Sequence, residues 1–268
     1  MRKLLNASFS RLWKNKVFWI AIACIVVAAV IISLQIELES VETVMLNVFP
    51  VIPLVCVVFI SIFIGTEFEE NTIRNKLIVG YTKTEIYFAN YLVSIVGSLI
   101  LLFAIIIFCG ITGFAQTDKF ILEGKQLAFV IFCTILITMI ESAICVGIVM
   151  NVNKTVFSLL FGLLILFGLM FLSAYIENSL GETKYVQRVI SISADDVANY
   201  ETVLNPHYVS GTTRKVMEFV LDLLPTGQAV QISNVSLERC MRWPALSVLS
   251  LGLVTVVGWL PFRKKDNR

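Results

Sequence analysis

Residues that build metal centres or disulfide frameworks are scarce in this sequence. It has a single histidine, His207, with no Cys/His cluster around it. Of its six cysteines only Cys240 lies outside the long apolar runs, and no two cysteines form a CxxC pair. We therefore expect no metal site and no disulfide framework. The cysteines are interpreted as small apolar residues in helix packing.

Motifs for nucleotide binding and catalysis are also missing. The sequence has no GxxxxGK[ST], GxSxG, HExxH or protein-kinase motif. The Lys and Arg runs near its two ends flank apolar segments and do not form a nucleic-acid-binding stripe. We expect a chain that is not an enzyme and holds no cofactor. If it performs energy-driven work, the energy must enter through a partner.

Charge is low and apolar residues dominate. Only 15% of the 268 residues are charged, 57% are hydrophobic, and the mean hydropathy is +0.86. Soluble globular domains do not have this composition. Six apolar runs are long enough to cross a bilayer, at residues 17–34, 44–64, 86–114, 127–150, 156–176 and 243–262. We predict an all-α membrane protein with six transmembrane helices, the first of them a retained span and not a signal peptide.

The basic residues predict the orientation of these helices. Most of the 21 Lys and Arg residues lie near the two ends of the chain and in the short loops at 65–85 and 151–154. Short loops rich in Lys and Arg stay on the cytoplasmic side. We therefore expect a multi-pass membrane protein with both termini and the 65–85 loop in the cytoplasm.

The segments outside the spans have distinct patterns. Residues 1–16 carry apolar side chains on one helical face and basic ones on the rest, so we predict a cytoplasmic amphipathic helix in the membrane plane. A plain basic flank is the alternative. Residues 177–242 form an extracellular helical segment in this interpretation, with a helix at 214–224 capped by Thr212 or Thr213. Thr226 is expected to cap a second short helix. The remaining parts are the spans at 17–176 and 243–262 and a cytoplasmic tail at 263–268.

The loop at 65–85 is a polar segment between two apolar runs. Thr66 with Glu69, and Thr82 with Glu85, have the spacing of capping boxes, so we predict that one helix starts near each threonine. Gly80 stands where a left-handed residue would end the first of these helices. The acidic residues would lie at the positive end of that helix and the basic ones toward its negative end. Such a helix suits contact with a soluble protein; a solvated loop is the alternative.

Glu141 is the one acidic residue inside an apolar run. Thr138 lies one helical turn away and Thr134 two turns away, which predicts a polar face directed into the bundle. An intramembrane carboxyl is costly and indicates function by default. One interpretation is a translocation role through contact with substrate or a proton. The other is a neutral Glu141 that packs between helices through hydrogen bonds.

Taken together, these patterns resemble the ABC-2 type transporter permeases, the membrane subunits of bacterial ABC exporters. The local match is residues 65–77, GTEFEENTIRNKL, which are similar to the family stretch GTEFExGTxRNxL after the second span. Asn71 stands where glycine is common. Residues 205–211 and 224–228 also resemble segments of small bacterial members, including peptide and lantibiotic exporters.

The resemblance implies the type II exporter (type V) fold and a place in the bacterial plasma membrane. It implies two permease subunits, identical or homologous, and two cytoplasmic ABC ATPase subunits that bind ATP and Mg²⁺. The helix after the second span would be the coupling helix that docks on the ATPase, through Thr66, Glu67, Phe68, Glu69, Glu70, Arg74 and Lys76. Export of amphipathic, antimicrobial or toxin peptides is the first expectation. Extrusion of small-molecule drugs or sodium, or a non-transporting sensor or assembly subunit, are the alternatives.

Overall fold

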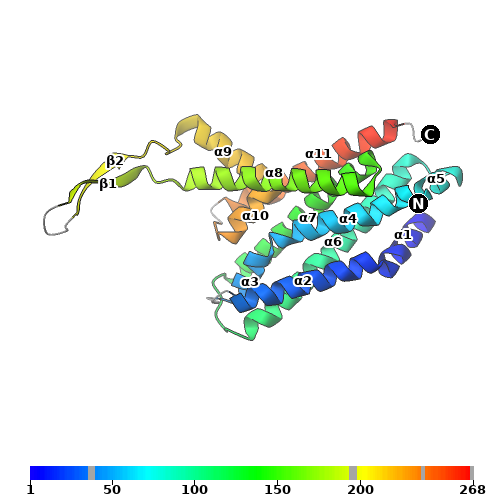
Figure 1. Ribbon diagram of the computed structural model, residues 1–268, viewed down its shortest axis with the longest axis horizontal. Coiled ribbons are helices and arrows are strands. Elements are labelled where there is room, and N and C mark those ends of the chain that lie inside the picture. The colour runs from blue at the N-terminus through cyan, green and yellow to red at the C-terminus, as the bar shows by residue number, and fades with distance from the viewer. Residues whose placement is uncertain (36–39, 193–197, 237–238, 266–268) are drawn as a thin grey trace.

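Helices make up most of the computed structural model, which describes every residue except 36–39, 193–197, 237–238 and 266–268 (Figure 1). In this part of the chain six helices are long and apolar enough to cross a membrane. They are α2 (Lys16–Gln35), α4 (Val51–Glu69), α6 (Lys83–Phe114), α7 (Gly124–Val152), α8 (Thr155–Gly181) and α11 (Trp243–Lys264). The prediction of six long apolar helices is confirmed, and their length and composition are typical of a multi-pass membrane protein.

The second apolar run is divided between two helices. A short helix, α3 (Val41–Val48), ends before Pro50, and α4 then continues to Glu69, five residues beyond the predicted end of the span. Pro50 is the N-cap of α4 and Pro53 lies in its first turn, where the missing proline N–H breaks no helical hydrogen bond. The predicted span at 44–64 is therefore wrong at both ends.

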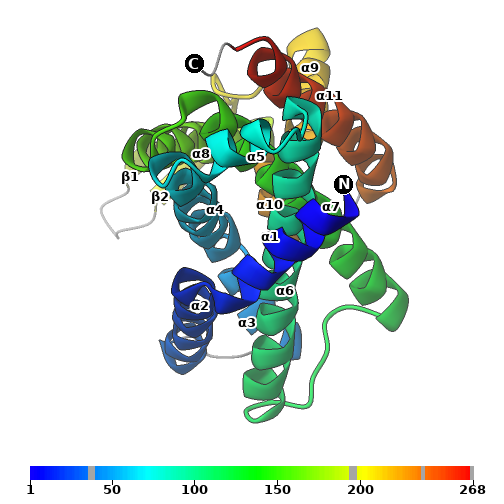
Figure 2. The ribbon, with the colours of Figure 1, turned by 90° about the vertical axis from the view of Figure 1, so that its right-hand side faces the viewer.

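Helix α7 occupies the centre of the bundle. It packs against α4, α6, α8 and α11, while α2 packs on α4 and α6 at the side (Figure 2). Helix α8 keeps a broad apolar face outward, with Val156, Leu160, Leu164 and Phe171 all exposed. Contact of such a surface with lipid is favourable, whereas its exposure to water is not.

The N-terminal helix α1 (Arg2–Lys14) lies across α6 near one end of the bundle (Figure 2). Leu4, Ser8 and Leu12 are buried at a spacing of four residues, so one face of α1 packs on the protein. Trp13, by contrast, is 51% exposed. The orientation of α1 in the membrane plane stays a prediction.

A β-hairpin follows α8 and extends away from the bundle, at the end opposite the two termini (Figure 1). Its antiparallel strands are β1 (Tyr185–Ile192) and β2 (Ala198–Leu204). The prediction of a purely helical segment at 177–242 is therefore wrong for these residues. Helices α9 (Gly211–Leu223) and α10 (Pro225–Ser233) and the 3₁₀ turn η1 (Cys240–Arg242) complete the segment.

The caps predicted for α9 and α10 are also wrong. Helix α9 has Ser210 as its N-cap, so Thr212 and Thr213 lie inside the first turn. Leu224 is the N-cap of α10, and Pro225 occupies the first helical position, where proline is favoured. The Thr226 hydroxyl instead donates to the Leu169 carbonyl of α8 at 3.2 Å.

Candidate functional site

Residues Thr66–Glu69 belong to the last turn of α4, so the predicted helix start at Thr66 is wrong. The Thr66 hydroxyl donates to the Phe63 carbonyl at 3.2 Å and does not form the predicted capping box with Glu69. Glu67 and Glu69 therefore lie at the negative end of α4, opposite to the expected placement in the helix dipole. No residue from Gly65 to Glu69 ends the helix, and Gly65 itself lies inside α4.

Gly65 has a packing reason to be glycine. A Cβ placed there would lie 2.8 Å from the Cα of Thr155, the first residue of α8. The contact brings the ends of α4 and α8 together next to the polar segment.

Asn71 makes the turn between α4 and the following helix, α5 (Thr72–Ile78). Its φ of 56° and ψ of 19° are left-handed, a conformation that glycine adopts freely and asparagine tolerates best among other residues. Asn71 therefore meets the same backbone requirement as the glycine that is common at this position in the resembling family. The Thr72 hydroxyl fastens the turn by donating to the Glu67 carbonyl at 2.8 Å.

The end of α5 and the start of α6 follow the sequence prediction. Gly80 has a φ of 100°, its N–H donates to the Leu77 carbonyl at 3.0 Å, and the Tyr81 N–H donates to the Lys76 carbonyl at 3.1 Å. These two bonds form a Schellman C-cap. The capping box of Thr82 and Glu85 is confirmed, with both reciprocal hydrogen bonds present.

Glu67 is the centre of a buried polar cluster that joins four helices. Only 2% of the residue is exposed. Its Oε2 accepts a hydrogen bond from Asn90 Nδ2 of α6 at 2.8 Å. Its Oε1 contacts Arg11 of α1 and Lys76 of α5. The Arg11 guanidinium also lies 4.0 Å from the centroid of the Phe63 ring of α4. We call Arg11, Glu67, Lys76 and Asn90 the Glu67 cluster.

One carboxylate faces two cations in the Glu67 cluster, so its charge holds both of them. Burial lowers the pKa of Arg11, while the charges of Glu67 and Glu70 act in the opposite direction. An arginine so placed stays charged at any physiological pH. Removing the carboxylate would leave two like charges close together in a site that is largely shielded from water.

The other residues predicted for partner docking divide into two groups. Glu69, Glu70 and Arg74 are exposed, whereas Phe68 is half-buried and packs against the core. The tip of α5 adds two exposed apolar side chains, Ile78 at 74% and Val79 at 75%. We call Glu69, Glu70, Arg74, Ile78 and Val79 the α5 surface. It lies at the end of the bundle that carries both termini (Figure 1).

No protein-family model and no curated protein matches this chain.

Sequence reasoning found Glu67 and Lys76 but not their partners. In the sequence, Arg11 is one of the basic residues before the first apolar run, and Asn90 lies near the start of the third. Their positions were the signal available in the sequence. A polar side chain just before an apolar run, or at its start, can contact a loop at the end of the bundle. Neither position identifies Glu67 as the common partner.

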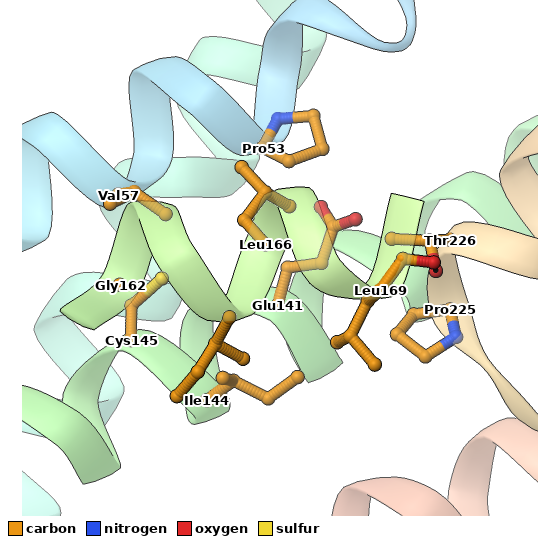
Figure 3. A pocket seen from close by; sticks show the side chains of 11 residues that line it. Pro53, Val57, Glu141, Ile144, Cys145, Gly162, Leu166, Leu169, Pro225 and Thr226 are labelled. Carbon is orange, nitrogen blue, oxygen red and sulfur yellow. Dashed lines mark hydrogen bonds between the residues drawn. The ribbon is translucent and has the colours of Figure 1, made fainter. Parts of the chain in front are cut away.

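Glu141 lies apart from this site, in the middle of α7, and 4% of it is exposed (Figure 3). The neighbouring hydroxyls do not reach it. Thr138 donates to the Thr134 carbonyl at 2.9 Å, Thr134 to the Val130 carbonyl at 2.8 Å, and Ser142 to the Thr138 carbonyl at 2.7 Å. Glu141 Oε1 is buried without a hydrogen-bond partner among the described residues. The hydrogen bonds that a packing role was expected to use are thus not formed by these side chains.

Two small cavities flank the Glu141 carboxyl. One, of about 20 Å³, lies between α4, α7, α8 and α10, with Pro53, Leu166 and Thr226 around the carboxyl (Figure 3). The other, also of about 20 Å³, is lined by Phe49 and by residues of α4, α7 and α10, including Thr134 and Ile232. Each has room for about one water molecule.

Proposed function

We propose that this chain is the permease subunit of an ATP-driven exporter of the ABC-2 type, coupled to a separate cytoplasmic ABC ATPase. The observation that supports this most is the α5 surface held by the Glu67 cluster. A helix of seven residues is not stable alone in water. Through the cluster, α5 is joined to α1, α4 and α6.

This construction suits the transfer of force between a soluble partner and a membrane bundle. A push on the α5 surface would act through Lys76 on Glu67, and through Glu67 on Arg11 and Asn90. Three membrane-associated helices would then move together. Exposed acidic residues beside exposed aliphatic ones also match the mixed polar and apolar character of protein interfaces.

For the cargo we propose amphipathic peptides of the antimicrobial or toxin type. A second permease subunit, identical or homologous, would complete the path, and the partner ATPases would bind ATP and Mg²⁺. Extrusion of small-molecule drugs or sodium is the second candidate for the same subunit. The family resemblance supports these cargo classes.

A sensor or assembly subunit that transports nothing is the alternative of a different class. It would share the six long helices, yet it has no need for a short helix braced against three others and facing outward. Recovery of an ABC ATPase with the chain from native membranes therefore separates the two classes.

The test reverses two charges on the α5 surface. The variant Glu69→Lys with Glu70→Lys is purified in mild detergent alongside wild type, and co-purified ATPase and cargo-stimulated ATP hydrolysis in vesicles are measured. The matched control, Asp118→Lys with Glu201→Lys, reverses two exposed acids at the opposite end. We expect the first variant to insert normally but to lose the ATPase or its stimulation, and the control to behave as wild type. Wild-type ATPase yield and coupling in the first variant would refute the docking role.

A further inference from the structure

Four carboxyl groups are almost completely buried in the part of the chain that the structure describes. They belong to Glu42, Glu67, Glu141 and Asp222, and none is more than 4% exposed. Burial of an ionised carboxyl is costly unless hydrogen-bond donors or cations replace the lost water. The partners of each group therefore indicate which charge state it holds.

Three of the four groups have such partners. Glu42 accepts from the backbone N–H groups of Ile121 and Leu122, at 3.3 and 3.1 Å. Glu67 has the two cations and the amide of its cluster. Asp222 Oδ1 accepts from Gln231 Nε2 at 3.1 Å and Trp243 Nε1 at 3.4 Å, and lies 3.5 Å from Arg239 Nε. All three environments suit an anion.

The surroundings of Glu141 contain no such group. Helix α4 brings Pro53, Val57 and Cys56 toward it, and α7 itself contributes Cys145. Helices α8 and α10 contribute only uncharged side chains to the two flanking cavities, of which the Thr226 hydroxyl is already engaged with α8. The titratable neighbours are thus two buried thiols. No described residue donates a hydrogen bond to Glu141 Oε1, and no cation lines either cavity.

We propose that Glu141 is a proton-binding site. In this conformation the carboxyl is protonated and neutral, and each flanking cavity holds one water molecule. Release breaks the carboxyl O–H bond, leaves the electron pair on the carboxylate oxygen and transfers the proton to water. Because the anion has no counter-charge here, release requires more water than the two cavities admit.

Helices α8 and α10 form the side of the first cavity that would have to open to admit this water. Thr226 of α10 lies 2.8 Å from Ser173 Oγ and donates to the Leu169 carbonyl, so its hydroxyl joins α10 to α8 beside the Glu141 carboxyl (Figure 3). Separation of these helices would admit water and let the proton leave. The protonation state of Glu141 would therefore depend on the position of α10 relative to α8. This inference does not depend on a partner ATPase, so it can fail or hold independently of the proposed function.

Infrared difference spectroscopy of the protein in lipid vesicles tests the charge state. The spectrum of wild type minus Glu141→Gln at neutral pH should contain the carbonyl stretch of a protonated carboxylic acid, and this band should shift in D₂O. Glu67→Gln provides the contrast, since its difference spectrum should contain carboxylate bands. Carboxylate bands in the Glu141 difference spectrum at neutral pH would overturn the proposal.

The rate at which the Glu141 band shifts in D₂O tests whether the contact between α8 and α10 limits access of water. Thr226→Ala removes the bond between α10 and α8 and should make the Glu141 band shift several-fold faster than in wild type. Ser233→Ala is the matched control, because this α10 hydroxyl donates to the Leu46 carbonyl at 3.2 Å and does not line either cavity. An unchanged rate in Thr226→Ala would overturn the role of the α8–α10 contact. An equal acceleration in both variants would do the same.

Discussion

The Glu67 cluster makes the most direct prediction about stability. Glu67→Gln keeps the size and shape of the side chain and removes its charge. Arg11 and Lys76 would then share a neutral amide in a site where the replaced residue is only 2% exposed. We expect α1 and α5 to loosen from the bundle while the spanning helices stay folded, because apolar packing and the membrane hold the latter.

The size of the effect follows from the burial of each partner. Removing one member of a buried ion pair costs about 3–5 kcal/mol. The Arg11 and Lys76 side chains are 30% and 18% exposed, so both can turn partly toward water and the lower end of that range applies. A loss of about 3 kcal/mol is roughly a hundredfold change in a local opening equilibrium, since about 1.4 kcal/mol corresponds to a factor of ten.

Hydrogen exchange followed by mass spectrometry measures this opening in peptides that cover α1 and α5. Glu69→Gln is the matched control, the same chemical change on an exposed residue two positions away, and it should exchange as wild type. Adding Lys76→Gln to Glu67→Gln should cost less than the two single changes added together, because one of the unpaired cations is gone. Equal exchange in Glu67→Gln and Glu69→Gln would show that the cluster does not hold these helices.

Three further predictions concern the turn, the helix packing and the topology. Asn71→Gly should leave thermal stability nearly unchanged, whereas Asn71→Val should lower it by about 1–2 kcal/mol because of the left-handed backbone; equal stability of the two variants would contradict this. Gly258→Ala places a Cβ 2.8 Å from the backbone of α7 and should cost about 1–3 kcal/mol in thermal denaturation, whereas Gly252→Ala, with open space around it, should not. A cysteine at exposed Thr183 should react with an impermeant reagent on intact cells, and one at Asn75 only after permeabilisation; the reverse pattern would refute the proposed orientation.

The six long helices could be predicted because the signal for them is local and strong. Each apolar run carries its own length and hydrophobicity, so no distant residue is needed to identify it. The capping box of Thr82 and Glu85 was predicted for the same reason, since both of its hydrogen bonds join residues three positions apart.

The capping-box spacing of Thr66 and Glu69 gave a wrong prediction, because both residues lie inside a helix that begins earlier. A capping spacing starts a helix only if the preceding residues leave the helical conformation, and here α4 continues to Glu69. The left-handed residue Asn71 marks the real boundary. The interpretation of residues 177–242 as a helical segment does not predict the hairpin. Its β-branched residues, among them Val186 and Val203, favour strands.

The buried glutamates Glu67 and Glu141 show why the partners at the two sites could not be predicted from the sequence. Glu67 lies in a polar segment and Glu141 inside an apolar run, but neither local sequence identifies the groups that surround the carboxyl in the fold. Their difference arises from partners that the fold supplies. Arg11 and Asn90 reach Glu67 from other helices, whereas no described residue donates a hydrogen bond to Glu141 Oε1 and no cation lines its cavities. A carboxylate held by two cations fixes helices in place, and a carboxyl without a counter-charge favours the proton. Which of these roles a buried acid takes is therefore decided by tertiary packing, and exchanging the partners should exchange the roles.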